Sequence, residues 1–437
     1  MQNDTATWDP GIECAELSDV GLRRANNQDA MTVVIAANEE SWRRRGHLFV
    51  VADGMGAHAA GELASKMAAD IVPHSYSKRL DEPPDVAIVA AMREANAQIH
   101  ARGQDNPEFR GMGTTGSSLV LLPEGALVAH VGDSRVYRLR GRQLDQLSFD
   151  HSLVWELMHS GDLPAKEVSN FVPKNIITRS LGPNPNVQVD LEGPFPLQVG
   201  DTFLLCSDGL SGLVNDEELG AMIYCLSPQE AVRTLVDLAN LRGGPDNITV
   251  IVVRVNALPD HDSLAQQGVS APVERTSRKP SPAAGALGGI ALVSLLLAAI
   301  LAFGGLALPA LAAGGMAVIF AVAAAILASA ASSQTSTSAP TEHRAGKGKG
   351  KGKGPHRTWT IKITPDLTNR LAQTVNELRD AGGDDNWNID WAAFDHLESQ
   401  ARSAAEQGHQ EDAVRSYARA ISFMMAEVRR CASSKST

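Results

Sequence analysis

Four aspartates, each at the junction between an apolar run and a tight turn, constrain this chain more than any other feature. They are Asp53, Asp133, Asp208 and Asp246, in the segments FVVADG, HVGDSR, FLLCSDG and GGPDNITVIVV. Carboxylates at strand ends can meet at one edge of a sheet, where they repel one another unless cations lie between them. Oxygen ligands favour hard divalent ions such as Mg²⁺ or Mn²⁺. A single Asp-Gly pair is an ordinary turn signal, but four such aspartates together predict an oxygen-ligated, two-metal hydrolytic site.

Composition limits the class of protein. The chain has 437 residues, which suggests two or three domains, and its formal net charge of −11 disfavours a nucleic-acid substrate. Its four cysteines form no CxxC pair, which argues against a zinc site or a disulfide scaffold and fits a reducing compartment. The first ten residues, MQNDTATWDP, are polar, so we expect no secretory signal there.

Short β-runs alternate with longer helical patterns over residues 12–255, and this alternation predicts one globular unit. The β-runs often come as adjacent pairs, which favours antiparallel hairpins. We therefore expect an α+β fold, a two-sheet antiparallel β-sandwich flanked by helices. Strands are predicted at 31–36, 48–52, 117–122, 127–131, 136–139, 202–206 and 248–253, and helices at 61–78, 85–102, 152–160 and 228–242. Residues 161–193, rich in Pro and Asn, predict an irregular excursion that could form a flap.

A polar linker at 256–284 precedes an uncharged apolar stretch at 285–331. One membrane helix needs about 20 apolar residues, and this stretch is more than twice as long. Because Gly304, Gly305 and Pro309 fall near its middle, two transmembrane helices in a hairpin are the simplest interpretation. Basic residues flank both ends, which predicts that both ends stay in the cytoplasm. A buried apolar helical pair in a soluble domain is the alternative.

The remainder of the chain predicts a second linker and a helical tail. Residues 332–356 are Ser/Thr-rich and then alternate Lys with Gly, a composition that builds no core but could also contact anionic lipid. Residues 357–437 predict a small α-helical region with helices at 389–406 and 410–430. The pattern partly resembles a tetratricopeptide-type helix pair, although a generic helical hairpin is the favoured interpretation.

The order of the motifs resembles a known family. GLRRANNQDA contains Arg24 and Asp29, and it is followed by DGMGAHAAGE, GMGTTGSSLV, VGDSRVYRLR, DHSLVWEL, ITRSLG, LLCSDGL and GGPDNITVIVV. In this order, over residues 12–255, they resemble the metal-dependent type 2C serine/threonine protein phosphatases in their bacterial form.

The resemblance implies a role for each matching residue. Asp53 would bridge two Mg²⁺ or Mn²⁺ ions, the Gly54 carbonyl would bind one of them, and Asp208 and Asp246 would complete the protein ligands. Asp133, with Asp208, would hold a third and weaker ion. Asp29 would orient water, Asn247 would brace Asp246, and Arg24 would bind the substrate phosphate through its guanidinium. A hydroxide bridging the two ions would attack phosphorus in line.

The chain departs from the family pattern in several places. Gln28 stands where many relatives carry Glu, and Met55 stands where eukaryotic members carry His, so the proton for the leaving group needs another source. His58 is a candidate, although an ordinary loop histidine is the favoured interpretation. Residues 172–175 read VPKN where many bacterial members have His-Pro before the Asn, and His151 is expected to brace a loop.

The sequence therefore predicts a membrane-tethered protein phosphatase that hydrolyses phosphoserine and phosphothreonine. Its catalytic unit and tail would lie in the cytoplasm at the inner membrane. The expected partners are phosphorylated proteins, membrane lipid and an unknown protein bound by the C-terminal helices, but no nucleic acid. Two alternatives remain: a catalytically silent scaffold that recruits partners at the membrane, and a metal-dependent phosphoesterase of another substrate class.

Overall fold

A computed structural model describes residues 8–56, 59–160, 173, 176–258, 352, 354–384 and 389–435. All of these belong to one compact unit. The hairpin predicted at 285–331 lies outside the described residues. Among the helices that the structure does describe, none is both long and apolar enough to span a bilayer.

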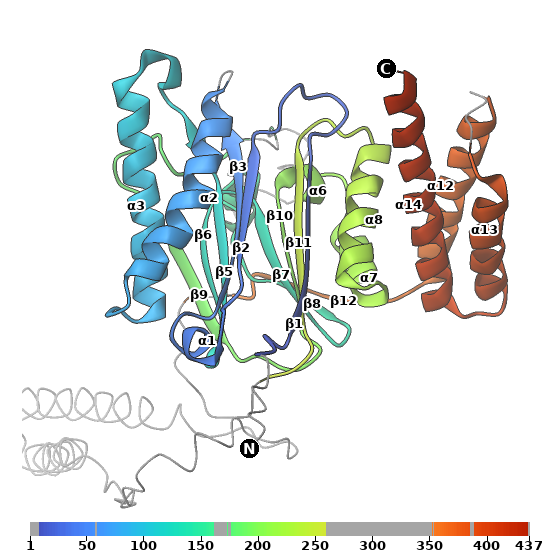
Figure 1. Ribbon diagram of the computed structural model, residues 1–437, viewed down its shortest axis with the longest axis horizontal. Helices are drawn as coiled ribbons and strands as arrows, with labels where there is room; N and C mark the ends of the chain where they lie inside the picture. Colours follow the sequence, from blue (N-terminus) through green and yellow to red (C-terminus); the bar gives the residue numbers. More distant parts are fainter. Residues whose placement is uncertain are drawn as a thin grey trace, which may run out of the picture. The chain divides into compact units, whose positions relative to one another are not determined.

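Two antiparallel sheets form the centre of the molecule (Figure 1). The first has the order β1-β11-β10-β7-β8-β12, with β1 (Ile12–Asp19), β11 (Ile248–Val255), β10 (Thr202–Cys206), β7 (Arg135–Arg140), β8 (Gln143–Gln146) and β12 (Arg357–Thr360). The second has the order β2-β3-β5-β6-β9, with β2 (Asp29–Val34), β3 (His47–Met55), β5 (Gly116–Leu122), β6 (Gly125–Val131) and β9 (Asp190–Phe195), and β4 (Gly113–Thr114) beside β3. The predicted two-sheet α+β architecture is confirmed.

Side chains that alternate along the strands fill three apolar layers. In β3, Phe49 and Val51 face the space between the sheets, whereas Leu48 and Val50 face the helices outside. The same alternation in β10 sends Phe203 inward to the sandwich. Both faces of the central strands are thus covered, which explains why their sequences are almost continuously apolar.

Helices cover both outer faces of the sandwich (Figure 1). Helices α2 (Ala60–Lys78) and α3 (Pro84–Asp105) cover the sheet that contains β3, and α7 (Asp216–Cys225) and α8 (Pro228–Leu241) cover the other. A capping box at Ser227 and Glu230 fixes the start of α8. The shorter elements are α1 (Glu39–Arg45), η1 (Pro107–Phe109), α4 (Leu153–Ser160) and α6 (Asp208–Ser211).

The C-terminal region is continuous with the catalytic core. Strand β12 adds to the free edge of β8 in antiparallel register, from Arg357 opposite Gln146 to Thr360 opposite Gln143. Helices α12 (Pro365–Asp384), α13 (Trp391–Glu406) and α14 (Gln410–Lys435) follow, and α14 lies beside α8 (Figure 1). Their apolar faces join one hydrophobic cluster with α7, α8 and the first sheet. The two helices predicted in the tail are present, and they pack against the catalytic unit.

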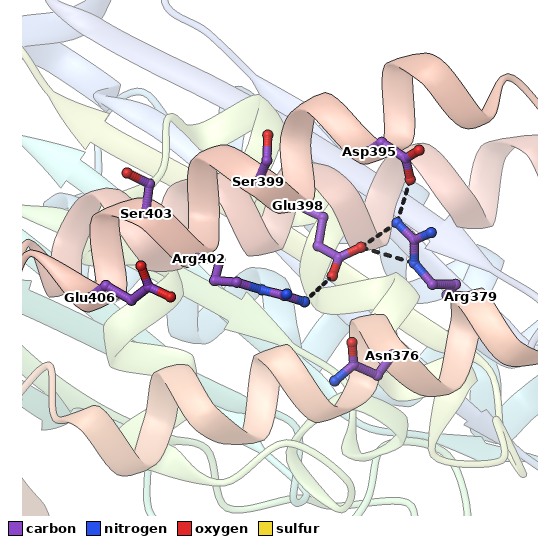
Figure 2. Close-up of a pocket in the computed structure, with 8 residues that line it drawn as sticks. All are labelled: Asn376, Arg379, Asp395, Glu398, Ser399, Arg402, Ser403 and Glu406. Carbon is purple, nitrogen blue, oxygen red and sulfur yellow. Dashed lines mark hydrogen bonds and ion pairs between the residues drawn. The ribbon is translucent and has the colours of Figure 1, made fainter.

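A cavity of about 560 Å³ lies among residues of α12 and α13 (Figure 2). Its centre is Glu398, whose carboxylate accepts hydrogen bonds from Arg379 Nε at 2.9 Å and Arg402 Nη2 at 2.6 Å. Arg379 also pairs with Asp395. These charges satisfy one another within the helical bundle, so the cavity is best understood as a groove between packed helices.

Candidate active site

The predicted acidic residues converge at one end of the sandwich. Asp29 opens β2 and lies directly opposite Asp53, near the end of β3. Asp133 follows β6, Asp208 opens α6 directly after β10 and Ser207, and Asp246 precedes β11. Strand register and strand ends therefore bring together five carboxylates that are far apart in the sequence.

The electrostatics of this acid cluster, Asp29, Asp53, Asp133, Asp208 and Asp246, show how close its members are. Burial raises the pKa of Asp53 well above its usual value, and the charges of the other four members raise it further. Burial also raises the pKa of Asp29 to about 7, despite hydrogen bonds from Thr249 and Ser207, and that of Asp133 to about 8. The pKa of Asp208 is raised by burial and by Asp246. Without cations, several of these groups would hold protons near neutral pH.

The hydrogen bonds of the cluster leave acceptor atoms without a partner. Asp29 Oδ2 accepts a hydrogen bond from Ser207 Oγ at 2.8 Å, but Asp29 Oδ1 and Asp133 Oδ1 are buried with no partner in the described structure. Buried acceptors of this kind are costly, and cations or water would satisfy them. The acid cluster therefore fits a group of hard divalent cations.

Side chains alone would not complete such a site. Among the described residues, no three His, Cys, Asp or Glu side chains are placed to enclose a metal ion by themselves. Mg²⁺ and Mn²⁺ sites commonly keep several waters and use few carboxylates, so backbone oxygen and water would supply the remaining ligands.

Gly54 lies where only glycine fits. A Cβ atom at this position would lie 2.1 Å from the Gly61 carbonyl oxygen and 2.4 Å from that of Gln28. The neighbouring Asp53 backbone is fixed by Thr115, whose hydroxyl accepts from Asp53 N at 2.8 Å and whose amide donates to Asp53 O at 2.9 Å. The turn that presents Asp53 and the Gly54 carbonyl is thus held tightly in place.

Asn247 connects the Arg24 loop to Asp246. Its backbone amide donates to Asp246 Oδ1 at 2.9 Å, and its side-chain oxygen accepts from Gln28 N at 2.8 Å. Its side-chain amide donates to the carbonyls of Val20 and Asn26. The backbone of Asn247 thus braces Asp246, and its side chain separately holds residues 20–28 against β11.

Arg24 is at the acid cluster but is engaged by a carboxylate. Its Nη2 lies 2.8 Å from Asp246 Oδ2, and its Nε donates to the Pro245 carbonyl at 3.2 Å. The guanidinium is about half exposed, at 47%. The positive charge of Arg24 therefore lies beside Asp246 and remains accessible to solvent. The contact of Arg24 with the substrate phosphate stays a prediction.

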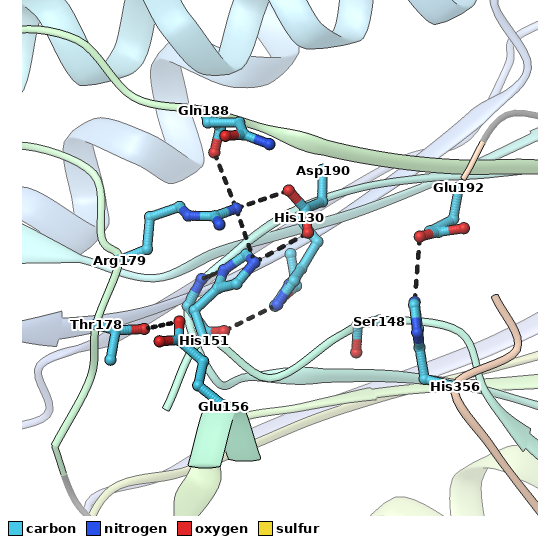
Figure 3. A network of polar contacts seen from close by, with 12 residues as sticks. His130, Ser148, His151, Glu156, Thr178, Arg179, Gln188, Asp190, Glu192 and His356 are labelled. Atoms are coloured by element: carbon cyan, nitrogen blue, oxygen red, sulfur yellow. Dashed lines mark hydrogen bonds and ion pairs between the residues drawn. The ribbon is translucent and has the colours of Figure 1, made fainter. Parts of the chain in front are cut away.

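His151 braces the turn that carries Asp133, as predicted, and its ring also contacts Asp190 (Figure 3). Its Nδ1 accepts from Gly132 N at 2.9 Å, which leaves the proton on Nε2 to donate to Asp190 Oδ2 at 3.0 Å. Arg179 Nη1 donates to the other oxygen of Asp190 at 2.6 Å. Although burial opposes it, hydrogen bonds from His151 and Arg179 lower the pKa of Asp190 to about 2. His58 and residues 172, 174 and 175 lie outside the described residues.

Several residues near the acid cluster were not singled out from the sequence. Arg135 binds Asp150 through Nη2 at 2.7 Å and Tyr137 Oη through Nη1 at 3.1 Å. Arg135 follows Asp133 in GDSR, which could have indicated it. Ser207 precedes Asp208 and offered the same kind of signal. Nothing in the sequence around Arg357 indicated that it reaches this site.

A cavity of about 350 Å³ adjoins the acid cluster. Two of the acids, Asp133 and Asp208, line it together with residues from α4, α6, β7, β12 and the segments directly before α4 and after α6: Arg135, Asp150, Ser152, Val154, Trp155, Met158, Ser211, Gly212 and Arg357. This cavity combines charged groups with an apolar wall, and it gives a peptide-sized ligand room beside the carboxylates.

Comparison with known proteins shows the family to which the chain is related. The family model described as protein phosphatase 2C matches residues 23–239. Protein phosphatase PhpP of Streptococcus pneumoniae is 39% identical over 250 residues, which cover 56% of this chain and 98% of that protein. The serine/threonine phosphatase stp of Listeria monocytogenes is 36% identical over 211 residues, 47% of this chain and 83% of that protein. The crystal structure of the Mycobacterium tuberculosis serine/threonine phosphatase PstP/Ppp matches with a TM-score of 0.50 at 33% identity, over 56% of this chain and 99% of that one.

The chain belongs to the protein phosphatase 2C family. It is a protein-serine/threonine phosphatase that depends on Mg²⁺ or Mn²⁺. The region from β12 onwards lies beyond the residues that the family model matches.

Proposed function

We propose that residues of the acid cluster hold the metal ions and that the phosphatase works at a membrane surface. Asp53, Asp208, Asp246 and the Gly54 carbonyl would bind two ions, and Asp133 with Asp208 would bind a third. The observation that carries this assignment is the convergence of five mutually repelling carboxylates, of which Asp29 and Asp133 are buried and each keep one oxygen atom without a partner in the described structure. Such an arrangement is stabilised by divalent cations.

The residues around the ions would orient the water and bind the substrate phosphate. When bound, the ions would make a water molecule acidic enough to serve as the nucleophile at neutral pH. Asp29, held by Ser207, would orient water from a position beside the ligands. Arg24 would release Asp246 to the ions and turn its guanidinium to the substrate phosphate, for which a planar fork of N–H donors is well suited. The phosphate would arrive on serine or threonine side chains of proteins phosphorylated by Ser/Thr kinases.

The intact cluster disfavours a silent scaffold, because a site without catalytic use need not retain five converging acids at such an electrostatic cost. The cavity beside the cluster also disfavours a small-molecule phosphate ester as the natural substrate. The cavity adds an apolar wall formed by Val154, Trp155 and Met158, which a peptide can contact.

Membrane tethering rests on the apolar stretch at 285–331 and on the position of the tail. Strand β12 pairs with β8, so the chain after the apolar stretch lies on the catalytic unit. If that stretch enters a membrane, an even number of crossings is required to bring β12 back to the same side. This argument supports a two-helix hairpin with the catalytic unit and the tail both in the cytoplasm. Lipid contact by the Lys-Gly tract would add to the attachment.

The full-length chain is the appropriate sample for the test, because removal of the tail would strip β12 from the sheet. Activity with Mn²⁺ should be measured on a phosphopeptide, a chromogenic phosphate ester and DNA, for the native chain and for Asp208→Asn. Phosphopeptide hydrolysis that chelator and Asp208→Asn both abolish supports the assignment. Full Mn²⁺-dependent activity in Asp208→Asn would contradict it. Protease digestion of inverted vesicles should remove both the catalytic unit and the tail, and protection of only one would refute the hairpin.

A further inference from the structure

Arg357 is carried to the active site by a strand that lies outside the family match. In β12 it pairs with Gln146 of β8, and Gln146 in turn pairs with Tyr137 of β7. Residues directly opposite one another in a sheet share a face, so Arg357, Gln146 and Tyr137 form one row. Arg135 lies two residues before Tyr137 and therefore on the same face. The register places a C-terminal arginine at the end of the sheet where the acid cluster lies.

The cavity beside the acid cluster has Arg357 in its wall. Asp133 and Asp208 line the same cavity of about 350 Å³. A substrate whose phosphate reaches the acid cluster would therefore have neighbouring residues within this cavity. Arg357 is thus placed to meet the part of the substrate that occupies this cavity.

The guanidinium of Arg357 is held by stacking rather than by a carboxylate. Its Cζ lies 3.8 Å from the centroid of the Trp155 ring. No hydrogen bond or ion pair ties it to another side chain in the described part of the structure, whereas the neighbouring Arg135 is bound to Asp150. Stacking on an aromatic face fixes the plane of a guanidinium and leaves its N–H donors available.

The surroundings of Arg357 favour an anion. Burial and the positive charge of Arg135 lower the pKa of Arg357. Two guanidiniums close together repel each other. Asp150 and Asp216 partly favour the charge of Arg357, but the contacts that they make, at 2.7 and 3.7 Å, are with Arg135. With divalent ions bound at the acid cluster, Asp133 and Asp208 would no longer contribute uncompensated negative charge. An anionic group from the substrate would then be the natural partner of Arg357.

We propose that Arg357, stacked on Trp155, forms an anion subsite that binds an acidic or phosphorylated side chain next to the target phosphoserine or phosphothreonine. This inference rests on the proposed function of the acid cluster. It makes the C-terminal region part of substrate recognition, so that the phosphatase selects acidic phosphopeptides. A carboxylate and a phosphate both offer paired oxygen acceptors to a guanidinium. The peptides described next distinguish between these two ligands.

The test compares phosphothreonine peptides that carry Ala, Glu, Lys or a non-hydrolysable phosphonate beside the target. For the native full-length chain we expect kcat/KM to be roughly five- to tenfold higher with Glu than with Ala, mainly through KM, as for one charge-assisted hydrogen-bonding contact. Lys should be the poorest of the four. A higher kcat/KM with the phosphonate than with Glu would identify doubly phosphorylated segments as the substrates. A higher kcat/KM with Glu would identify segments in which an acidic residue lies next to the target. Equal values for Ala and Glu in the native chain would overturn the proposal.

The variant Arg357→Gln should reduce the Glu-to-Ala ratio to about one, while Arg402→Gln, on the far helix α13, should leave both the ratio and the activity unchanged. If Arg357→Gln does not fold, Arg357→Lys provides the test. Lysine keeps the positive charge but lacks the planar guanidinium that stacks on Trp155, so the preference for the phosphonate peptide should fall. An undiminished preference in the folded variant would overturn the subsite. Mn²⁺-dependent hydrolysis of a chromogenic phosphate ester distinguishes failure of the Arg357 subsite from failure of the proposed function. If the native chain does not hydrolyse this ester, the proposed function itself is refuted.

Discussion

Ile361 packs directly over Gly220, and this contact joins the C-terminal region to the catalytic unit. A Cβ atom at Gly220 would lie 2.3 Å from Ile361 Cδ1 and 2.6 Å from its Cγ1. Ile361 is 1% exposed and belongs to the same hydrophobic cluster as Leu144 of β8. The glycine in α7 thus forms the recess that receives the residue following β12.

Gly220→Ala should therefore destabilise the protein. The added methyl group must displace Ile361, and overpacking of this kind costs about 1–3 kcal/mol. Thermal or denaturant unfolding would measure the loss. Gly383→Ala in α12 is the matched control, because nothing lies within 4 Å of a Cβ there. That control should be neutral or slightly stabilising. If the contact is real, the double variant with Ile361→Ala should lose less free energy of unfolding than the two single changes added together.

The sequence allowed the acidic site to be predicted because its members carry local signals. Asp53 and Asp208 each follow an apolar strand and precede glycine, and strands of this pattern bring their ends together. The position of the tail could not be predicted in the same way. The apolar faces of the helices at 389–406 and 410–430 indicate burial but do not identify the surface they bury.

Long-range contacts decide that surface. Thr358 Oγ1 donates to Asp145 Oδ1 at 2.8 Å across a separation of 213 residues. Strand β8 is only the four residues QLDQ, which lack the apolar alternation that marks a strand. The edge that receives β12 was therefore not recognisable, and neither was the arrival of Arg357 at the cavity.

Metal binding should stabilise the protein more at alkaline than at acidic pH. The pKa values of Asp29 and Asp133 are raised by burial to about 7 and about 8 in the folded protein. A carboxyl group whose pKa is raised on folding favours the folded state below its unfolded pKa of about 3.9, and this contribution is lost as pH rises through the folded value. The metal-free protein should consequently lose stability between about pH 4 and pH 8.

Divalent ions would replace those protons, so the rise in Tm caused by Mn²⁺ should be larger at pH 8 than at pH 5.5. Differential scanning calorimetry with and without chelator would measure it. Asp133→Asn should reduce the pH dependence of the metal-free protein because one titrating group is removed. An equal Mn²⁺-induced shift at both pH values would contradict this linkage.

Arg24→Gln should separate phosphate binding from metal binding. In the structure the Arg24 guanidinium lies 2.8 Å from Asp246 Oδ2, where it competes with a cation for that carboxylate. Its removal should leave Mn²⁺ affinity equal or higher while raising KM for a phosphopeptide, because a bidentate donor to phosphate is lost. Calorimetric titration and steady-state kinetics would measure the two effects. Arg23→Gln, one residue earlier, provides the control, and a fall in Mn²⁺ affinity on Arg24→Gln would argue that the arginine supports the metal site.

His151 should influence activity through the position of Asp133 rather than by proton transfer. Its ring accepts a hydrogen bond from Gly132 N, in the turn between β6 and β7, and also contacts Asp190 (Figure 3), so it fixes that turn. Partners that orient metal ligands typically contribute ten- to a hundredfold to metal affinity or activity, and we expect His151→Ala to lose activity by about that factor. Because the ring contacts no reacting atom, the variant should keep the pH profile of the native enzyme.

Asp190→Asn should cause a similar but smaller loss of activity, since His151 would keep its bond to Gly132. His396→Ala, on the exposed face of α13, should cause no loss. A shifted pH optimum in His151→Ala would instead place the imidazole in the proton transfer itself.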